Sequence, residues 1–208
     1  PVAVRSIADI QEAIRRQASQ TPDGRWIRAN GYNEFYLADK RHPNRRDLDA
    51  ASPGHPVKLS HRSGHACVLN SRAMELLGIS VETEEPEGGM MERDLDTGEP
   101  NGLLFEMNTF VDGQIPPLTE DDLEAGVRLV SEAFLANGIT SLQDATWSNS
   151  AGRWQLLRRL KERGALLPRV SMMIGADALE DGRLFDQGDP ADDLRLGPVK
   201  IIIQAATG

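Results

Sequence analysis

The stretch LSHRSGHACVLNS, residues 59–71, holds two of the chain's four histidines, His61 and His65, and its only cysteine, Cys67. Imidazole and thiolate groups bind metals and act as bases or nucleophiles, so the stretch could be a metal site, a nucleophile site or packing. The i,i+4 spacing of the histidines would serve one metal on a helix. Gly64 between them disfavours a helix, and the glutamate of a zinc-protease motif is missing, so a two-histidine metal site is not favoured.

His65 is better interpreted as a ligand-facing residue on a strand-to-helix turn, because a neutral imidazole can both donate and accept hydrogen bonds. A capping or packing histidine fits the sequence equally well. Cys67 follows two residues later, and on a strand it would share a face with His65. Since a lone cysteine in an apolar setting is usually a small buried hydrophobe, we predict that Cys67 packs in the core.

Two charged residues accompany otherwise apolar strand candidates further along the chain. Asp144 closes ITSLQD, and Lys200 stands before three isoleucines in GPVKIIIQA. Buried charges are costly unless they are paired or ligating, and polar side chains at the carboxyl ends of barrel strands form active sites. The plain alternatives are a turn-capping role for Asp144 and, for Lys200, a lysine at the start of its strand that reaches water.

The elements that must position these residues fall into two parts of an α/β chain. Up to about residue 117 we expect a helix at 6–20, strands at 25–30 and 56–63, a helix at 70–79 and two short strands around DTGEPNG. From Leu118 onward, helices and strands alternate, which is typical of a parallel sheet. The predicted domains are therefore residues 1–117 and 118–208.

Composition narrows the classes of partner. The net charge of −9 argues against nucleic-acid binding, which needs clustered Lys and Arg. No apolar run approaches the ~18 residues of a membrane span. One cysteine excludes an intrachain disulfide framework and favours a reducing compartment. We therefore expect a cytoplasmic protein with a small-molecule substrate and without nucleic-acid or membrane partners.

Four segments follow one another in a specific order: WIRANGYNE, RHPNRRDLDAASPGHPVKLSHRSGHACVLNSRAMELLGI, EPEGGMMERDLDTGEPNGLLFE and NGITSLQDA. This order resembles amidohydrolase family 3, the YtcJ-like metal-dependent hydrolases, from about Ser6 to Gly208. Members are (β/α)8 barrels with an insertion after the first barrel strand, and they are longer than this chain. The resemblance implies an internal fragment: an α+β insertion subdomain near the active-site mouth (1–117) and partial barrel units two to four (118–208).

The resemblance also implies a reaction, namely hydrolysis of an amide-like C–N bond of a small molecule by a metal-activated water. A divalent metal, expected to be zinc, would belong to the full-length enzyme. His65 and Asn70 match a recurring GH…NS element and, with Asp144, are the expected substrate-binding residues. GPVK resembles the position of a metal-bridging lysine, so Lys200 is expected to be carbamylated in the full-length enzyme.

Departures from the family keep a second hypothesis open. The family's His-x-His motif is missing, and Gln204-Ala205 stands where many members have Asp-Gly. We therefore expect the catalytic residues to lie outside this fragment, which alone would be inactive, bind no metal and self-associate through exposed strand edges. The alternative is a non-catalytic binding or regulatory domain that keeps the fold. A flavodoxin-like domain is disfavoured because no Gly-rich phosphate turn follows a strand.

Overall fold

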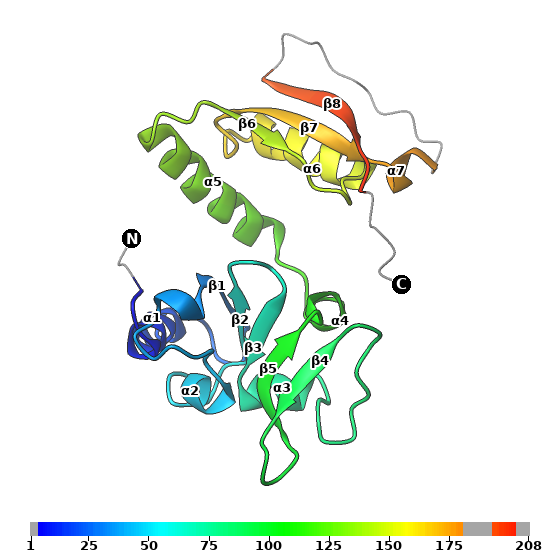
Figure 1. The fold of residues 1–208 in the computed structure, drawn as a ribbon. Coiled ribbons are helices and arrows are strands. Elements are labelled where there is room, and N and C mark those ends of the chain that lie inside the picture. Colours follow the sequence, from blue (N-terminus) through cyan, green and yellow to red (C-terminus); the bar gives the residue numbers. More distant parts are fainter. Residues whose placement is uncertain (1–3, 181–192, 203–208) are drawn as a thin grey trace. The chain divides into compact units, whose positions relative to one another are not determined.

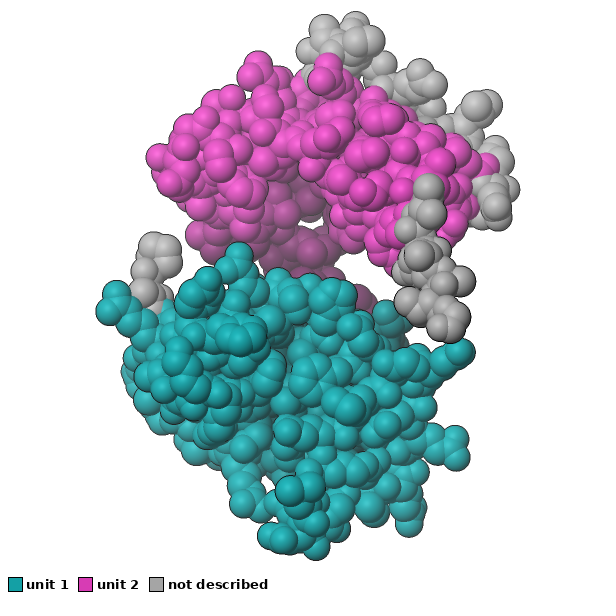
Figure 2. All heavy atoms as spheres, in the orientation of Figure 1, with its two compact units in different colours: residues 1–116 teal, residues 117–208 magenta. Residues whose placement is uncertain are grey.

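The computed structural model describes residues 4–180 and 193–202. The chain divides into two compact units, Pro1–Pro116 and Pro117–Gly208, which Figure 2 colours separately. Each unit contains a sheet and helices, so the α/β class is confirmed. The interpretation of the units as an insertion and as barrel units two to four stays a prediction.

Unit 1 is built around a five-stranded sheet in the order β1-β2-β3-β5-β4 (Figure 1). The strands are β1 (Ile27–Tyr32), β2 (Val57–His61), β3 (Ala66–Leu69), β4 (Met90–Arg93) and β5 (Pro100–Phe105). β1 and β2 run parallel, and the other neighbours are antiparallel. The register pairs Tyr32 with His61, and Phe105 with both Ala66 and Met90. The ends of β1, β2 and β5 and the beginning of β3 therefore meet at one edge of the sheet.

The helices of unit 1 are α1 (Ile7–Ala18), the 3-10 turn η1 (Glu34–Tyr36), α2 (Arg45–Asp49), α3 (Ser71–Leu76) and α4 (Asn108–Asp112). α1 begins as predicted, because the Ser6 side chain accepts a hydrogen bond from the Asp9 backbone N–H. The Asp9 carboxylate accepts a hydrogen bond from the Arg5 backbone N–H. α1 buries the apolar face Ile7, Ile10 and Ile14 in the unit's core.

The strand β3 is the main element that the sequence did not predict in unit 1. Its four residues, ACVL, are all buried, so the period-two alternation that marks a half-exposed strand is absent. His65 consequently lies in the turn between β2 and β3, and its predicted place on a strand-to-helix turn is wrong.

Unit 2 carries a three-stranded parallel sheet in the order β6-β7-β8. Its elements are α5 (Glu120–Ala136), β6 (Ser141–Asp144), α6 (Ala151–Glu162), β7 (Arg169–Gly175), α7 (Asp177–Glu180) and β8 (Leu194–Lys200). The alternation predicted from Leu118 onward is thus confirmed across the described residues. Trp154 and Leu160 of α6 pack in a core with Val170 and Met172 of β7.

β8 departs from its predicted position. It passes through Gly197-Pro198 with a register irregularity opposite 172–174 and ends at Lys200. The interpretation of Lys200 as a lysine at the start of its strand is therefore wrong. Ile201 and Ile202 follow the strand and are 67% and 51% exposed. Gln204 lies outside the described residues. In the described segments, no helix combines the length and apolarity needed to cross a bilayer.

Candidate functional site

Ionisable side chains of unit 1 gather at the sheet edge where β1, β2 and β5 end. Glu34 follows β1, His61 ends β2, His65 precedes β3 and Glu106 follows β5. Because the register brings these strand ends together, residues from three separate segments of the chain occupy one edge. We refer to this set, with Tyr32 and His42, as the sheet-edge cluster.

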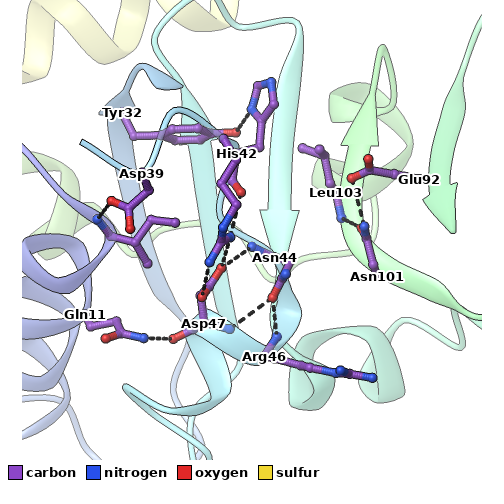
Figure 3. Close-up of polar contacts among 12 residues, drawn as sticks. Gln11, Tyr32, Asp39, His42, Asn44, Arg46, Asp47, Glu92, Asn101 and Leu103 are labelled. Carbon is purple, nitrogen blue, oxygen red and sulfur yellow. Dashed lines mark hydrogen bonds and ion pairs between the residues drawn. The ribbon is translucent and has the colours of Figure 1, made fainter. Parts of the chain in front are cut away.

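A half-buried carboxylate links two of the imidazoles. Glu34 Oε2 lies 2.9 Å from His61 Nε2, and Glu34 Oε1 lies 3.7 Å from His42 Nε2. Glu34 Oε2 and His61 Nε2 are buried, and neither makes a well-directed hydrogen bond among the described residues, so their contact is electrostatic. The Tyr32 hydroxyl lies 2.9 Å from His42 Nδ1, the contact drawn in Figure 3. Burial and the Glu34 charge raise the pKa of Tyr32, so the phenol stays protonated and can donate this bond.

The loop that carries His42 is anchored beside this cluster. The Asn44 side chain caps α2, and the Asp47 carboxylate accepts a hydrogen bond from the Asn44 backbone N–H (Figure 3). Arg41 makes two bonds of 2.6 and 3.0 Å to the same carboxylate. Burial raises the pKa of Asp47, but the Arg41 and Asn44 bonds outweigh burial and lower it overall. These contacts fix a loop that has no strand or long helix of its own.

The turn between β2 and β3 is held by its own polar groups. The Ser63 backbone N–H donates to His61 Nδ1 over 3.2 Å, and the Ser63 hydroxyl lies 2.7 Å from the same nitrogen. The Ser63 oxygen in turn accepts the His65 N–H over 3.2 Å. Because His61 Nδ1 accepts, the neutral ring carries its proton on Nε2, toward Glu34. His61 therefore stabilises the turn in which His65 lies.

His65 itself faces solvent. Its side chain is 71% exposed, and its Nδ1 lies 2.9 Å from Oε1 of Glu106. An exposed ring of this kind does not pack in the core, so the packing interpretation is wrong. The predicted contact of His65 with substrate stays a prediction.

Asn70 is fully buried and its amide is saturated by the protein. Its oxygen accepts the N–H groups of Val57 and Ala73, each over 2.9 Å, and so caps α3. Its NH2 donates to the carbonyls of Ser52 and His55 over 3.0 and 2.8 Å. Asn70 thus ties β2, α3 and the loop 52–55 together, while its predicted role toward substrate stays a prediction.

Cys67 is a core residue. Its side chain is fully buried on β3, and burial raises the pKa of its thiol to about 11. A thiol that stays protonated at neutral pH is a poor nucleophile. The predicted packing role of Cys67 is confirmed.

In unit 2, Asp144 and Lys200 both lie at carboxyl ends of the parallel strands. Asp144 accepts the Thr146 N–H over 3.0 Å, as the turn-capping interpretation requires. Burial raises the pKa of Asp144, but hydrogen bonds from Thr146 and Asn149 outweigh burial and hold it below its ordinary value. The carboxylate is therefore ionised at neutral pH. Its role toward substrate stays a prediction.

Lys200 lines an open pocket of about 540 Å³ together with Trp147, Asp177 and the two exposed isoleucines that follow β8. The lysine pairs with Gly175, the last residue of β7, so the pocket lies at the strand ends. At Gly175 a side-chain Cβ would lie 2.1 Å from the Trp147 carbonyl oxygen, so the loop after β6 passes directly over this glycine. Lys200 thus lines an open pocket at the carboxyl ends of β7 and β8.

The sequence reasoning missed four members of the sheet-edge cluster, namely Tyr32, Glu34, His42 and Glu106. Glu34 follows a recognised strand candidate, and Glu106 closes the segment NGLLFE, so a search for acids at strand ends would have found both. His42 lies in a polar, Pro-rich loop that carries no such signal. The clustering itself depends on strand order, which the sequence pattern does not give.

The donor groups do not make a complete metal centre by themselves. Within residues 4–180 and 193–202, no three His, Cys, Asp or Glu side chains come together in a way that could hold a metal ion. The described residues therefore do not fit a self-contained metal site.

Comparisons with known proteins agree on a family. The profile of the amidohydrolase family matches residues 1–208. An N-substituted formamide deformylase of Arthrobacter pascens is 29% identical over 97% of this chain and 39% of its own length. The putative amidohydrolase YtcJ of Bacillus subtilis is 30% identical over 66% of this chain and 26% of its own. The fold matches an uncharacterised metal-dependent hydrolase of Pyrococcus furiosus with a TM-score of 0.56 and 24% identity, over 94% of this chain and 38% of that one.

Proposed function

The chain belongs to the amidohydrolase family, and from this premise we propose that it is part of a longer enzyme that hydrolyses an amide-like C–N bond, of the non-peptide type, in a small molecule. The observation that carries the proposal is the family match along the whole chain, with a deformylase aligned to 97% of it. That relative acts on N-substituted formamides by name. Formamides of this type are therefore the first substrates to try.

The chain's own residues would serve binding and positioning in this reaction. His65 of unit 1 presents an exposed imidazole and Asp144 of unit 2 an ionised carboxylate. Asn70 caps α3 and ties it to β2 and the loop 52–55. A divalent metal, expected to be zinc, would supply Lewis-acid chemistry and an activated water, with its remaining ligands outside the described residues. We further propose the (β/α)8 barrel for the complete enzyme and a cytoplasmic location.

A non-catalytic binding or regulatory domain is the second candidate. One observation favours this candidate: the His, Cys, Asp and Glu side chains of the described residues would need further ligands to form a metal centre. The two candidates differ in what surrounds this chain in the gene. A His-x-His motif after an apolar strand in the upstream coding region favours the enzyme, and a coding region without it favours the binding domain.

The test uses the complete protein. Purified protein is analysed for bound metals and then incubated with a panel of N-substituted formamides and simple amides, with release of the amine as the readout. We expect a stoichiometric divalent metal and turnover of at least one compound. A metal-free protein without turnover after metal addition would overturn the proposed hydrolase.

A further inference from the structure

We propose that Glu106 is a positioning residue that holds His65 in its Nδ1–H tautomer, so that Nε2 faces outward as an acceptor for an N–H or O–H group of the substrate. The inference deepens the proposed function and rests on it for the identity of the ligand. The tautomer itself is a property of the described residues and needs no ligand. It can therefore be tested separately.

The tautomer follows from the chemistry of the contact. Glu106 Oε1 lies 2.9 Å from His65 Nδ1. The contact is at ion-pair distance without the geometry of a hydrogen bond, so it acts through charge. A carboxylate this close repels the lone pair of a bare nitrogen and favours the tautomer that carries the proton on Nδ1. In the neutral ring the other nitrogen is then an acceptor. Across residues 4–180 and 193–202 no hydrogen bond is made to Nε2 of His65, whose ring is 71% exposed.

Three hydrogen bonds hold the backbone around the pair. The Glu106 N–H donates to the His65 carbonyl over 2.8 Å and extends the β3–β5 ladder by one bond. The His65 N–H donates to Ser63 Oγ, and the Asn108 amide donates to the Gly64 carbonyl over 2.7 Å. His65 is thus held from both sides of the sheet edge. Because the backbone of the turn is held in this way, the position from which the His65 side chain extends is defined.

The conformation of Glu106 is the second, independent observation. Its φ is +53°, in the left-handed region that non-glycine residues seldom adopt and that tends to occur at functional sites. The Glu106 side chain is 57% exposed, so core packing does not account for a glutamate there. The contact that the strained residue makes is the one to His65. We infer that the carboxylate is retained for that contact.

The test is nitrogen NMR of histidine side chains in the 208-residue chain labelled with ¹⁵N. The His65 signals are assigned by their loss in His65→Gln. In the neutral ring we expect a protonated Nδ1 and an unprotonated Nε2. In Glu106→Gln we expect a mixture of both tautomers, because a carboxamide can donate as well as accept.

Glu99→Gln is the matched control. Glu99 directly precedes β5 and pairs with Arg45, so this variant removes a carboxylate at the other end of the strand without touching His65. The control should keep the wild-type tautomer. A His65 ring that is protonated on Nε2 in the wild type, or an unchanged tautomer in Glu106→Gln, would overturn the proposal.

A kinetic readout in the complete enzyme separates this inference from the proposed function. Losing one directed hydrogen bond in the ground state should raise KM about ten-fold in Glu106→Gln while kcat changes little. An unchanged KM overturns the ligand role of the pair. If the NMR result holds but no amide is turned over, the tautomer assignment stands and the proposed hydrolase falls.

Discussion

Two histidines that are four residues apart in the sequence have different tasks in the structure. His61 accepts the Ser63 N–H and faces Glu34 from a nearly buried position, whereas His65 is exposed and faces Glu106. The sequence favours neither a shared metal nor a nucleophile here, and the contacts explain both exclusions. What a residue type can do is readable from the sequence, but which partner it meets depends on strands that lie far away along the chain.

The thiol of Cys67 should make stability fall at alkaline pH. Burial raises its folded pKa from 9.0 to about 11. Below pH 9 the thiol is protonated in both states; between about 9 and 11 it ionises mainly in the unfolded state, so the free energy of unfolding decreases. The slope is at most about 1.4 kcal/mol for each pH unit. Urea unfolding at pH 8 to 10 measures it, and in Cys67→Ala this part of the decrease should vanish. An equal slope in both proteins would contradict the assignment.

Asn70→Ala should destabilise unit 1 strongly. The change removes the cap of α3 and leaves two buried N–H groups and two carbonyls without their partner, at a cost of about 3 kcal/mol. Chemical denaturation monitored by circular dichroism gives the value. Asn137→Ala, an exposed position after α5, is the control and should change stability by less than about 0.5 kcal/mol. Equal effects of the two changes would show that the buried network contributes little.

Lys200 carries the prediction about modification. In the complete enzyme, Lys200→Ala should abolish metal binding and hydrolysis, because the change removes the amine that carbon dioxide would convert into a metal-bridging carbamate. Metal analysis and ¹³C NMR after labelling with ¹³CO2 measure both effects, and the 208-residue chain alone should show an unmodified lysine. Lys161→Met, on α6, is the control. Unchanged metal content in Lys200→Ala would remove Lys200 from the metal site.

At the level of helices and strands, local signals were sufficient where they were strong. The helices α1 and α5 were both expected from the sequence, and Ser6 and Thr119 cap them through backbone N–H groups three residues further along. β3 and the beginning of β8 were missed for opposite reasons. β3 is short and buried throughout, whereas Gly197-Pro198 indicates a break that the β7–β8 pairing absorbs as an irregularity. Pairing partners are long-range information, so neither the sheet order nor the sheet-edge cluster could be predicted.

Gly175→Ala should damage the strand-end pocket of unit 2. A Cβ there would lie 2.1 Å from the Trp147 backbone oxygen, and backbone cannot move aside as a side chain can. We expect a loss of at least about 2 kcal/mol from overpacking. The control is Gly126→Ala inside α5, where a Cβ meets nothing within 4 Å and should add about 0.5–1 kcal/mol by helix propensity. Thermal unfolding of both variants measures the two losses of stability. An unchanged stability in Gly175→Ala would show that the loop after β6 shifts to make room for the Cβ.

At the scale of the whole chain, the relatives are much longer than this chain of 208 residues. The chain covers 39% of the deformylase and 26% of YtcJ, while its own described part forms two units with separate cores. Unit 2 has two edge strands, β6 and β8, and exposes apolar side chains on α5 such as Leu129 at 68% and Val130 at 51%. Exposed edges and apolar faces of this kind recruit other chains.

We therefore propose that the 208-residue chain associates with itself. Light scattering should give an average mass that rises with concentration from micromolar to millimolar. Leu129→Lys should shift this rise to higher concentration, because a charge on the α5 face opposes its burial. Leu95→Lys, in the hairpin turn of unit 1 where the side chain is fully exposed, should leave the rise unchanged. A constant monomer mass over the whole range would contradict the prediction.

The left-handed backbone of Glu106 has a consequence for laboratory evolution. Glycine and asparagine adopt a φ of +53° at lower cost than glutamate, and no buried contact requires the longer side chain. A library of the complete enzyme that is enriched only for survival of heating should therefore accumulate Gly or Asn at position 106. A library enriched for turnover should keep Glu. The two selections would then give different residues at position 106. Comparing the stability and the turnover of the two products would measure how far heat resistance and activity are opposed in this protein.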